Sequence, residues 1–301
     1  MVKPDRDEKL VYIKTSMILG VILAIFLVWL WWARIYTSKG NVFNAMLSNS
    51  LSMYGVSKEV SQYGASGKMT QVSQAQFGAV NIVDIKTDIE QTTEQGDVKV
   101  TTRTLATPTE DFVRYSSIDM PTAEGKAKID FSPLLNEWGR TSKVEGGGST
   151  FSQAVFGIVP FGNLPADKRN QLLNIIHSKD VYKTDFSKTE IKNENGRIVY
   201  AYPVEVNVQA YAELLKTYDE MLGLKQMEQL NPDDYASAEP IKATLTADKL
   251  SRTLVKIVYG EGGQEESFSG YGVHQSVEVP ETTTSRQEIE SKLQKLLNGA
   301  Q

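Results

Sequence analysis

The chain of 301 residues has no cysteine and only two histidines, His177 and His274. The absence of cysteine excludes disulfide bonds, a thiolate metal site, a cysteine nucleophile and a lipid-modified cysteine. A zinc or general-base site would require the two distant histidines to converge with carboxylates. We therefore expect no metal ion and no cofactor.

The recognisable motifs of enzymes are also missing. The chain contains no G-x-S-x-G, no H-E-x-x-H and no EF-hand loop. The glycine run at residues 146–148 lacks the spacing and the following lysine of a phosphate-binding loop. We therefore expect no enzymatic activity. A surface hydrolase is the alternative, and it would require carboxylates that converge in a polar cleft.

The long uncharged run at residues 15–33 reads TSMILGVILAIFLVWLWWA. As a helix it would extend about 28 Å, close to the roughly 30 Å core of a bilayer. Trp29, Trp31 and Trp32 near its end are typical of the membrane–water interface. A cleaved signal peptide is the rival interpretation, but its apolar run is shorter and ends at a small-residue site that is missing here. We predict an uncleaved transmembrane anchor.

Charges beside this run predict its orientation. The cations before it are Lys3, Arg6, Lys9 and Lys14, and those after it are Arg34 and Lys39. Because cytoplasmic flanks carry the excess of positive charge, we predict that residues 1–14 lie in the cytoplasm. Residues 15–33 would cross the cell membrane once, and residues 34–40 would be a short tether. The bulk of the chain would then be extracytoplasmic.

Residues 41–283 are predicted to form one extracytoplasmic domain, followed by an amphipathic helix at 284–301. Beyond residue 40 the chain holds 26 basic and 34 acidic residues, a formal charge of −8. This acidic balance disfavours nucleic acid as a partner. A cysteine-free domain outside the membrane is typical of a bacterial or archaeal cell envelope.

Alternating apolar and polar residues predict antiparallel strands, and apolar stripes predict helices. Asn195-Gly196 predicts a tight hairpin turn, Asn207 and Gly223 predict the ends of one helix, and the motif from Ser285 to Glu288 predicts a capping box. The expected strands are residues 83–89, 98–105, 111–118, 181–191, 197–206, 241–246, 252–259 and 267–279. The expected helices are residues 41–53, 133–138, 166–177, 208–222 and 285–297.

Residues 154–164, AVFGIVPFGNL, are apolar but interrupted by Gly157, Pro160 and Gly162. These residues disfavour both a long helix and a central strand. One interpretation is a connection that fills the core. The other is the lip of an apolar cavity, because binding sites often lie on loops over a rigid frame. On that second interpretation the ligand-binding side chains are Val155, Phe156, Ile158, Val159, Phe161 and Leu164.

The order of elements resembles the superfamily of bacterial envelope proteins that contains LolA and the mycobacterial LppX and LprG lipoproteins. The similarity is carried by residues 44–51 (NAMLSNSL), by residues 240–250 (PIKATLTADKL) and by the strands that follow to Gly272. It implies an α+β fold in which a curved antiparallel sheet forms an open half-barrel with helices over its concave face. It also implies an apolar cavity that holds acyl chains. The lipidated cysteine that anchors LppX-like proteins is replaced here by the apolar helix.

These observations give two expectations of function. The first is a membrane-tethered binding protein that holds a lipid or a lipid-linked group without covalent chemistry. The second is a structural or interaction protein of the cell envelope, with a filled core and another envelope protein as its partner.

Overall fold

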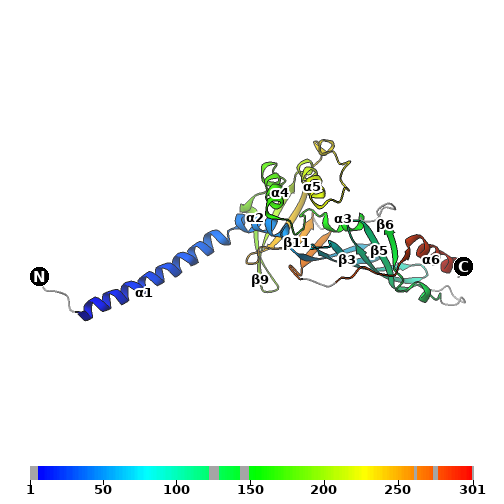
Figure 1. Ribbon diagram of the computed structural model, residues 1–301, viewed down its shortest axis with the longest axis horizontal. Helices are drawn as coiled ribbons and strands as arrows, with labels where there is room; N and C mark the ends of the chain where they lie inside the picture. Colours follow the sequence, from blue (N-terminus) through cyan, green and yellow to red (C-terminus); the bar gives the residue numbers. More distant parts are fainter. Residues whose placement is uncertain (1–5, 122–128, 143–148, 261–262, 274–276, 300–301) are drawn as a thin grey trace.

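A computed structural model describes residues 6–121, 129–142, 149–260, 263–273 and 277–299. Helix α1 (Arg6–Trp31) extends away from the rest of the molecule and continues into a short π-helix, η1 (Trp32–Tyr36). Residues 17–36, which include the end of α1 and all of η1, form a span long and apolar enough to cross a membrane, and none of this span is buried against the protein. Figure 1 shows this helix standing clear of the folded domain.

The domain is built on one sheet of thirteen strands in the order β13-β6-β5-β4-β3-β2-β1-β12-β11-β10-β9-β7, with β8 paired to β9. Neighbouring strands are antiparallel, except that β13 pairs with β6 in parallel. In the described residues the two end strands do not pair with each other. The strands are β1 (Gly55–Gly64), β2 (Gly67–Gln76), β3 (Ile82–Thr93), β4 (Gly96–Ala106), β5 (Glu110–Asp119), β6 (Gly139–Ser142), β7 (Tyr182–Thr184), β8 (Glu190–Glu194), β9 (Arg197–Val206), β10 (Ile241–Asp248), β11 (Leu254–Tyr259), β12 (Glu265–Ser269) and β13 (Thr284–Ser285).

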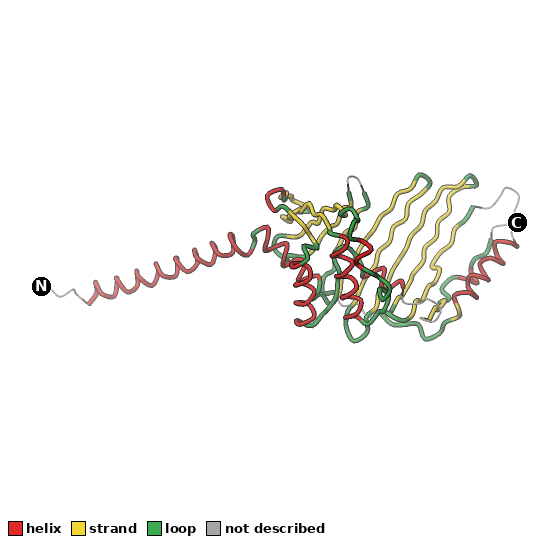
Figure 2. The backbone as a smooth tube through the Cα atoms, turned by 90° about the horizontal axis from the view of Figure 1, so that it is seen from above, coloured by secondary structure: helices red, strands yellow, loops and turns green. Residues whose placement is uncertain are grey.

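Three helices gather over one part of the sheet, near the point where α1 joins the domain (Figure 2). They are α2 (Lys39–Ser50), α4 (Ala166–Ser178) and α5 (Val208–Leu222). The ends of α5 agree with the prediction, since Asn207 accepts the Ala210 amide at 3.2 Å and Gly223 adopts a positive φ of 68°. The predicted hairpin turn is also confirmed, with positive φ at Asn195 and Gly196.

The main hydrophobic core lies between these helices and the sheet. Met46 of α2, Leu172 of α4 and Leu214 of α5 are fully buried. Val83 and Ile85 of β3 face them, whereas Asp84 on the opposite face accepts two hydrogen bonds from Arg103, at 2.9 and 2.7 Å. We call the face that carries the helices the helix-bearing face.

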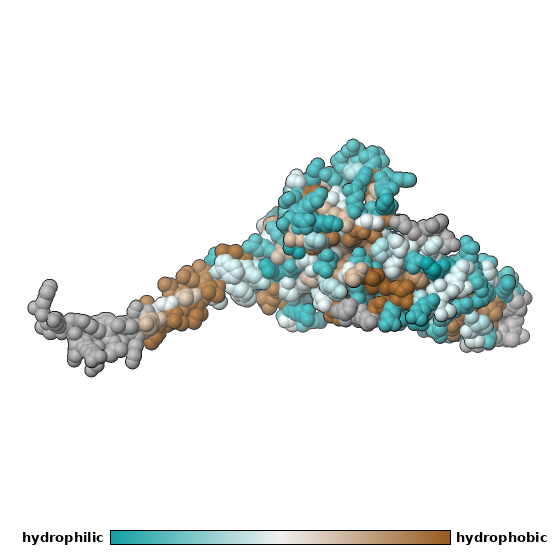
Figure 3. All heavy atoms as spheres, viewed as in Figure 1, coloured by the Kyte–Doolittle hydropathy of each residue, from teal (hydrophilic) through white to brown (hydrophobic). Residues whose placement is uncertain are grey.

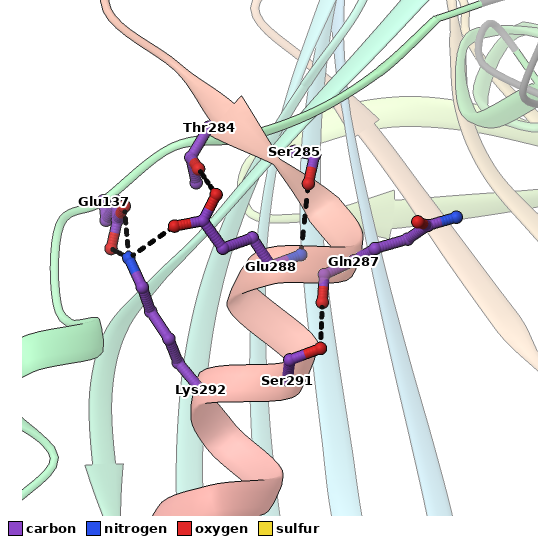
Figure 4. Close-up of polar contacts among 7 residues, drawn as sticks. All are labelled: Glu137, Thr284, Ser285, Gln287, Glu288, Ser291 and Lys292. Atoms are coloured by element: carbon purple, nitrogen blue, oxygen red, sulfur yellow. Dashed lines mark hydrogen bonds and ion pairs between the residues drawn. The ribbon is translucent and has the colours of Figure 1, made fainter.

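A smaller core forms at the far end of the sheet under α6 (Arg286–Gly299). Ile289 packs there with Phe131 and Leu134. Figure 4 shows how the start of this helix is held: Ser285 accepts the Glu288 amide at 3.2 Å, and Lys292 bonds to Glu137 at 2.9 Å. The Glu288 carboxylate accepts a hydrogen bond from Thr284 instead of closing the predicted capping box.

The strand predicted at residues 181–191 is divided into β7 and the start of β8 by the 3-10 turn η4 (Phe186–Lys188), because the Asp185 side chain accepts the Ser187 amide and caps this turn. Two other predicted elements are shorter than expected. Residues 133–138 form only the 3-10 turn η2 (Ser132–Leu134), since Leu135 takes an extended conformation (φ −71°, ψ 136°) and Asn136 then takes a positive φ of 66°. The strand predicted at residues 267–279 ends at Ser269, because Gly270 and Gly272 turn the chain with φ of 62° and 71°. Strands β1, β2, β6 and β13 were not predicted.

Candidate ligand-binding site

The apolar segment at residues 154–164 lies in the main core. Val155, Ile158, Val159, Phe161 and Leu164 are each at most 7% exposed, and Phe156 is half-buried. The structure therefore brings all six predicted side chains together on the helix-bearing face. The segment begins in the last two residues of the short helix α3 (Ser149–Val155) and ends shortly before α4.

Three tyrosine hydroxyls hold the backbone of this segment. Tyr182 of β7 donates to the Ile158 carbonyl at 2.5 Å, Tyr211 of α5 donates to Gly157 at 2.5 Å, and Tyr218 of α5 donates to the Phe161 carbonyl. Because the segment has almost no regular structure, these bonds satisfy carbonyls that would otherwise be buried without a partner. Burial raises the pKa of all three tyrosines, so each hydroxyl keeps the proton that it donates.

The end of the segment is tied to α2 and to the chain just after it. The amide of Gly162 donates to the Ser50 carbonyl at 2.9 Å, and that of Leu164 donates to Leu51 at 2.9 Å. A side chain at Gly162 would lie 3.3 Å from the Tyr218 hydroxyl. The small residue therefore lets the segment approach α5 closely.

A small cavity lies between this segment and strands β1, β2 and β12. Val155, Val159 and Phe161 line one side, and the other side includes Phe268 and Ala75. The volume open to water is only about 10 Å³, the space of about one water molecule. An acyl chain could enter this cavity only if the apolar segment moved away from the sheet.

One wall of the cavity carries a buried carboxylate, Glu266 of β12. It is 7% exposed, and its Oε2 atom has no hydrogen-bond partner among the described residues. Burial and this neighbouring carboxylate raise the pKa of Tyr259. Lys58 of β1 also lines the cavity. The site is thus mainly apolar, with a few polar groups.

Between the main core and the smaller core, the helix-bearing face remains apolar, and at one end of this stretch Ile118 packs against the smaller core. Met69 of β2 pairs with Ile89 of β3, Ile89 pairs with Val100 of β4, and Val100 pairs with Ile118 of β5. We call these four residues the apolar row. Ile89 is 38% exposed, and the other three are partly exposed. The surface view in Figure 3 shows hydrophobic side chains interrupting the polar surface of the domain.

The groups that an enzyme or a metal site would need do not converge in the described part of the chain. No cluster of three His, Asp or Glu side chains suited to a metal ion occurs there. His177 is exposed in the last turn of α4, and His274 lies outside the described residues. A larger cleft, lined by Arg103, Arg114 and Trp138, lies on the opposite face of the sheet, and Arg114 stacks on Trp138 at 4.7 Å.

The three tryptophans predicted at the membrane interface lie at the end of α1 and the start of η1. Trp29, Trp31 and Trp32 are 41–56% exposed. Trp31 packs its ring against Tyr36 at 5.8 Å between centroids. These side chains form an exposed aromatic group just before the domain begins.

No protein-family model matches the chain, and no curated protein sequence is significantly similar to it.

Proposed function

We propose that this protein is a membrane-tethered extracytoplasmic binding protein. Residues 15–33 would anchor it in the cell membrane, and the sheet would act as a half-barrel that holds a lipid or lipid-linked group. Binding would bury acyl methylenes, worth about 0.8 kcal/mol each, with no covalent step. The cavity beneath the apolar segment is the observation that carries this proposal, because predicted ligand-binding side chains line it.

Because the cavity is too small for an acyl chain, binding would require the apolar segment to move away from the sheet. Displacing the apolar segment breaks its bonds to Tyr182, Tyr211 and Tyr218, and hydrogen bonds of this kind contribute about 1 kcal/mol each. The ligand would replace the apolar contacts that the segment gives up. The apolar row provides further surface on the same face of the sheet for a longer chain.

A fluorescent fatty-acyl probe tests this proposal with the full chain in detergent micelles or nanodiscs. Ala154→Trp, from the segment, and Ser73→Leu, from β2, each place a larger apolar side chain in the space that the ligand would take once the segment has moved. We expect both variants to weaken saturable probe binding at least about tenfold, because the cavity would be occupied. Val80→Trp is the matched control, since Val80 is 61% exposed and does not line the cavity.

Circular dichroism of each variant separates a filled cavity from a failure to fold. A wild-type chain that binds no probe would contradict the proposal. Binding that both folded cavity variants retain at the wild-type level would also contradict it.

The dense core favours a second candidate, a structural or interaction protein of the cell envelope. Its partner would be another envelope protein that docks on the apolar row or on α6. Leu293 of α6 packs against the smaller core, so replacing it would also disturb the helix. Ile89→Asp is the better test, because this exposed change should abolish a reproducible cross-link without unfolding the domain. An unchanged set of cross-linked partners would count against this candidate.

A further inference from the structure

The junction between α1 and the domain is fixed by several contacts. The hydroxyl of Tyr200 donates to the Thr37 carbonyl at 2.9 Å, and that of Tyr202 donates to the Lys39 carbonyl at 2.9 Å. The guanidinium of Arg252 stacks on the Tyr36 ring at 3.9 Å. Because these contacts join η1 and α2 to β9 and to the turn after β10, the direction of α1 relative to the domain is set.

Three apolar side chains are exposed at this end of the domain. Ile191 of β8 is 63% exposed, Ile198 of β9 is 48% exposed, and Leu250 in the turn after β10 is 59% exposed. Their positions are linked to the junction, since Ile191 pairs with Tyr200 across the strands. The amide of Lys249, the residue before Leu250, donates to the Ile198 carbonyl at 3.0 Å. Figure 1 shows β9 at the end of the domain where α1 enters.

Two cations accompany these apolar residues. The ammonium of Lys249 lies over the Tyr200 ring at 6.0 Å, and Arg252 lies over Tyr36. In the described part of the chain, neither side chain forms an ion pair with a carboxylate. Cations at the membrane end of an anchored domain can lie close to the phosphates of a lipid surface.

The length of the junction sets how far this end of the domain lies from the hydrocarbon core of the bilayer. Thr37 comes five residues after Trp32, at the end of the π-helix η1. Because a π-helix rises less per residue than an α-helix, this distance along the axis is at most about 7.5 Å, the rise of five α-helical residues. The headgroup layer on each side of a bilayer is about 5–7 Å thick. If Trp32 lies at the edge of the hydrocarbon core, groups level with Thr37 lie at the headgroups.

We propose that Ile191, Ile198 and Leu250, with Lys249 and Arg252, form a second membrane contact beside the anchor. The three apolar side chains would enter the interface of the bilayer that holds α1, and the two cations would lie near lipid phosphates. This inference rests on the proposed membrane anchoring. It goes beyond it, because it fixes which end of the domain lies on the lipid surface.

Since the chain has no cysteine, a single Leu250→Cys variant can carry one environment-sensitive fluorophore. The full chain would be reconstituted into vesicles of phosphatidylcholine and phosphatidylglycerol that contain nitroxide-labelled lipid. We expect quenching by the labelled lipid to be about threefold stronger at residue 250 than at Gln294→Cys, because an interfacial side chain lies among the headgroups. Gln294 is exposed on α6, which lies at the opposite end of the molecule (Figures 1 and 2).

Flotation of the same vesicles separates the two proposals. Protein that does not float with lipid would overturn the membrane anchor. Protein that floats but shows equal quenching at residues 250 and 294 would overturn the second contact alone. Charge-reversed Lys249→Glu/Arg252→Glu protein should show weaker quenching at residue 250 in vesicles containing phosphatidylglycerol, whereas Lys295→Glu should leave it unchanged.

Discussion

Two parts of the same sheet share the alternation of apolar and polar side chains, but helices cover the apolar face in only one of them. In the helix-packed part, Val83 and Ile85 of β3 are buried under the main core. On the same face of the same strand, four residues after Ile85, Ile89 is 38% exposed because no described helix covers it. The comparison shows that the strand pattern sets which face is apolar, whereas the helices decide where that face is covered.

The largest difference between the two parts should appear in stability. Tyr218→Ala removes a fully buried ring that packs against Phe156, and we expect it to lower the free energy of unfolding by about 3–5 kcal/mol. Ile89→Ala should cost less than about 1 kcal/mol, because little buried surface is lost. Chemical denaturation of the full chain in detergent measures both. Equal losses of unfolding free energy in the two variants would contradict the division of the sheet into a covered and an uncovered part.

If the smaller core unfolds independently of the main core, a change in the smaller core should destabilise only the elements near it. Ile289→Asp places a charge at a buried position beneath α6, so this helix should detach. We expect amide exchange in α6 to rise about 100-fold while β9 stays protected. Gln294→Asp on the exposed side of the helix is the control and should change neither. A simultaneous loss of protection in β9 would show that the two cores unfold as one.

A smaller effect is expected from the loss of one hydrogen bond that fixes the apolar segment. Tyr211→Phe removes the bond to the Gly157 carbonyl and should lower stability by about 1 kcal/mol. Because the segment is then easier to displace, the acyl probe should associate faster. Stopped-flow fluorescence checks this rate, with Tyr235→Phe as a control on an exposed tyrosine. A slower or unchanged association would mean that the segment does not open for the ligand.

The smallest effect concerns pH at α6. Hydrogen bonds from Thr284 and Lys292 lower the pKa of Glu288 below its usual value of 4.5. A lowered pKa means that the contribution to stability is present above pH 4.5 and is lost as pH falls through the folded-state pKa. Nuclear magnetic resonance of α6 amides should therefore show the helix loosening in acid. Glu288→Gln should remove this dependence, and a dependence that persists in the variant would assign it to another group.

The sequence was most informative where local signals agreed. Helix α5 was predicted with its observed ends, because its apolar stripe lies between a side-chain cap at Asn207 and a left-handed glycine at Gly223. Strands β1 and β2 escaped prediction because polar residues occupy part of their helix-bearing face. Lys58 and Ser73 are paired there, so the alternation of polar and apolar residues is broken.

The candidate site was only partly predictable for a different reason. The composition of residues 154–164 indicated an apolar irregular segment, and this is confirmed by its burial. The three tyrosines that hold it were not predicted, since they come from β7 and α5, later in the chain. Only tertiary packing aligns their hydroxyls with carbonyls of the segment. The cavity depends on the same packing and leaves no local signal.

The most direct test of the proposed function is native mass spectrometry of the full chain, purified in mild detergent and followed by lipid extraction. The account predicts about one retained lipid or lipid-linked molecule per chain, largely lost in Ala154→Trp and retained in Val80→Trp. A lipid content at the detergent background, or equal content in all three proteins, would contradict it.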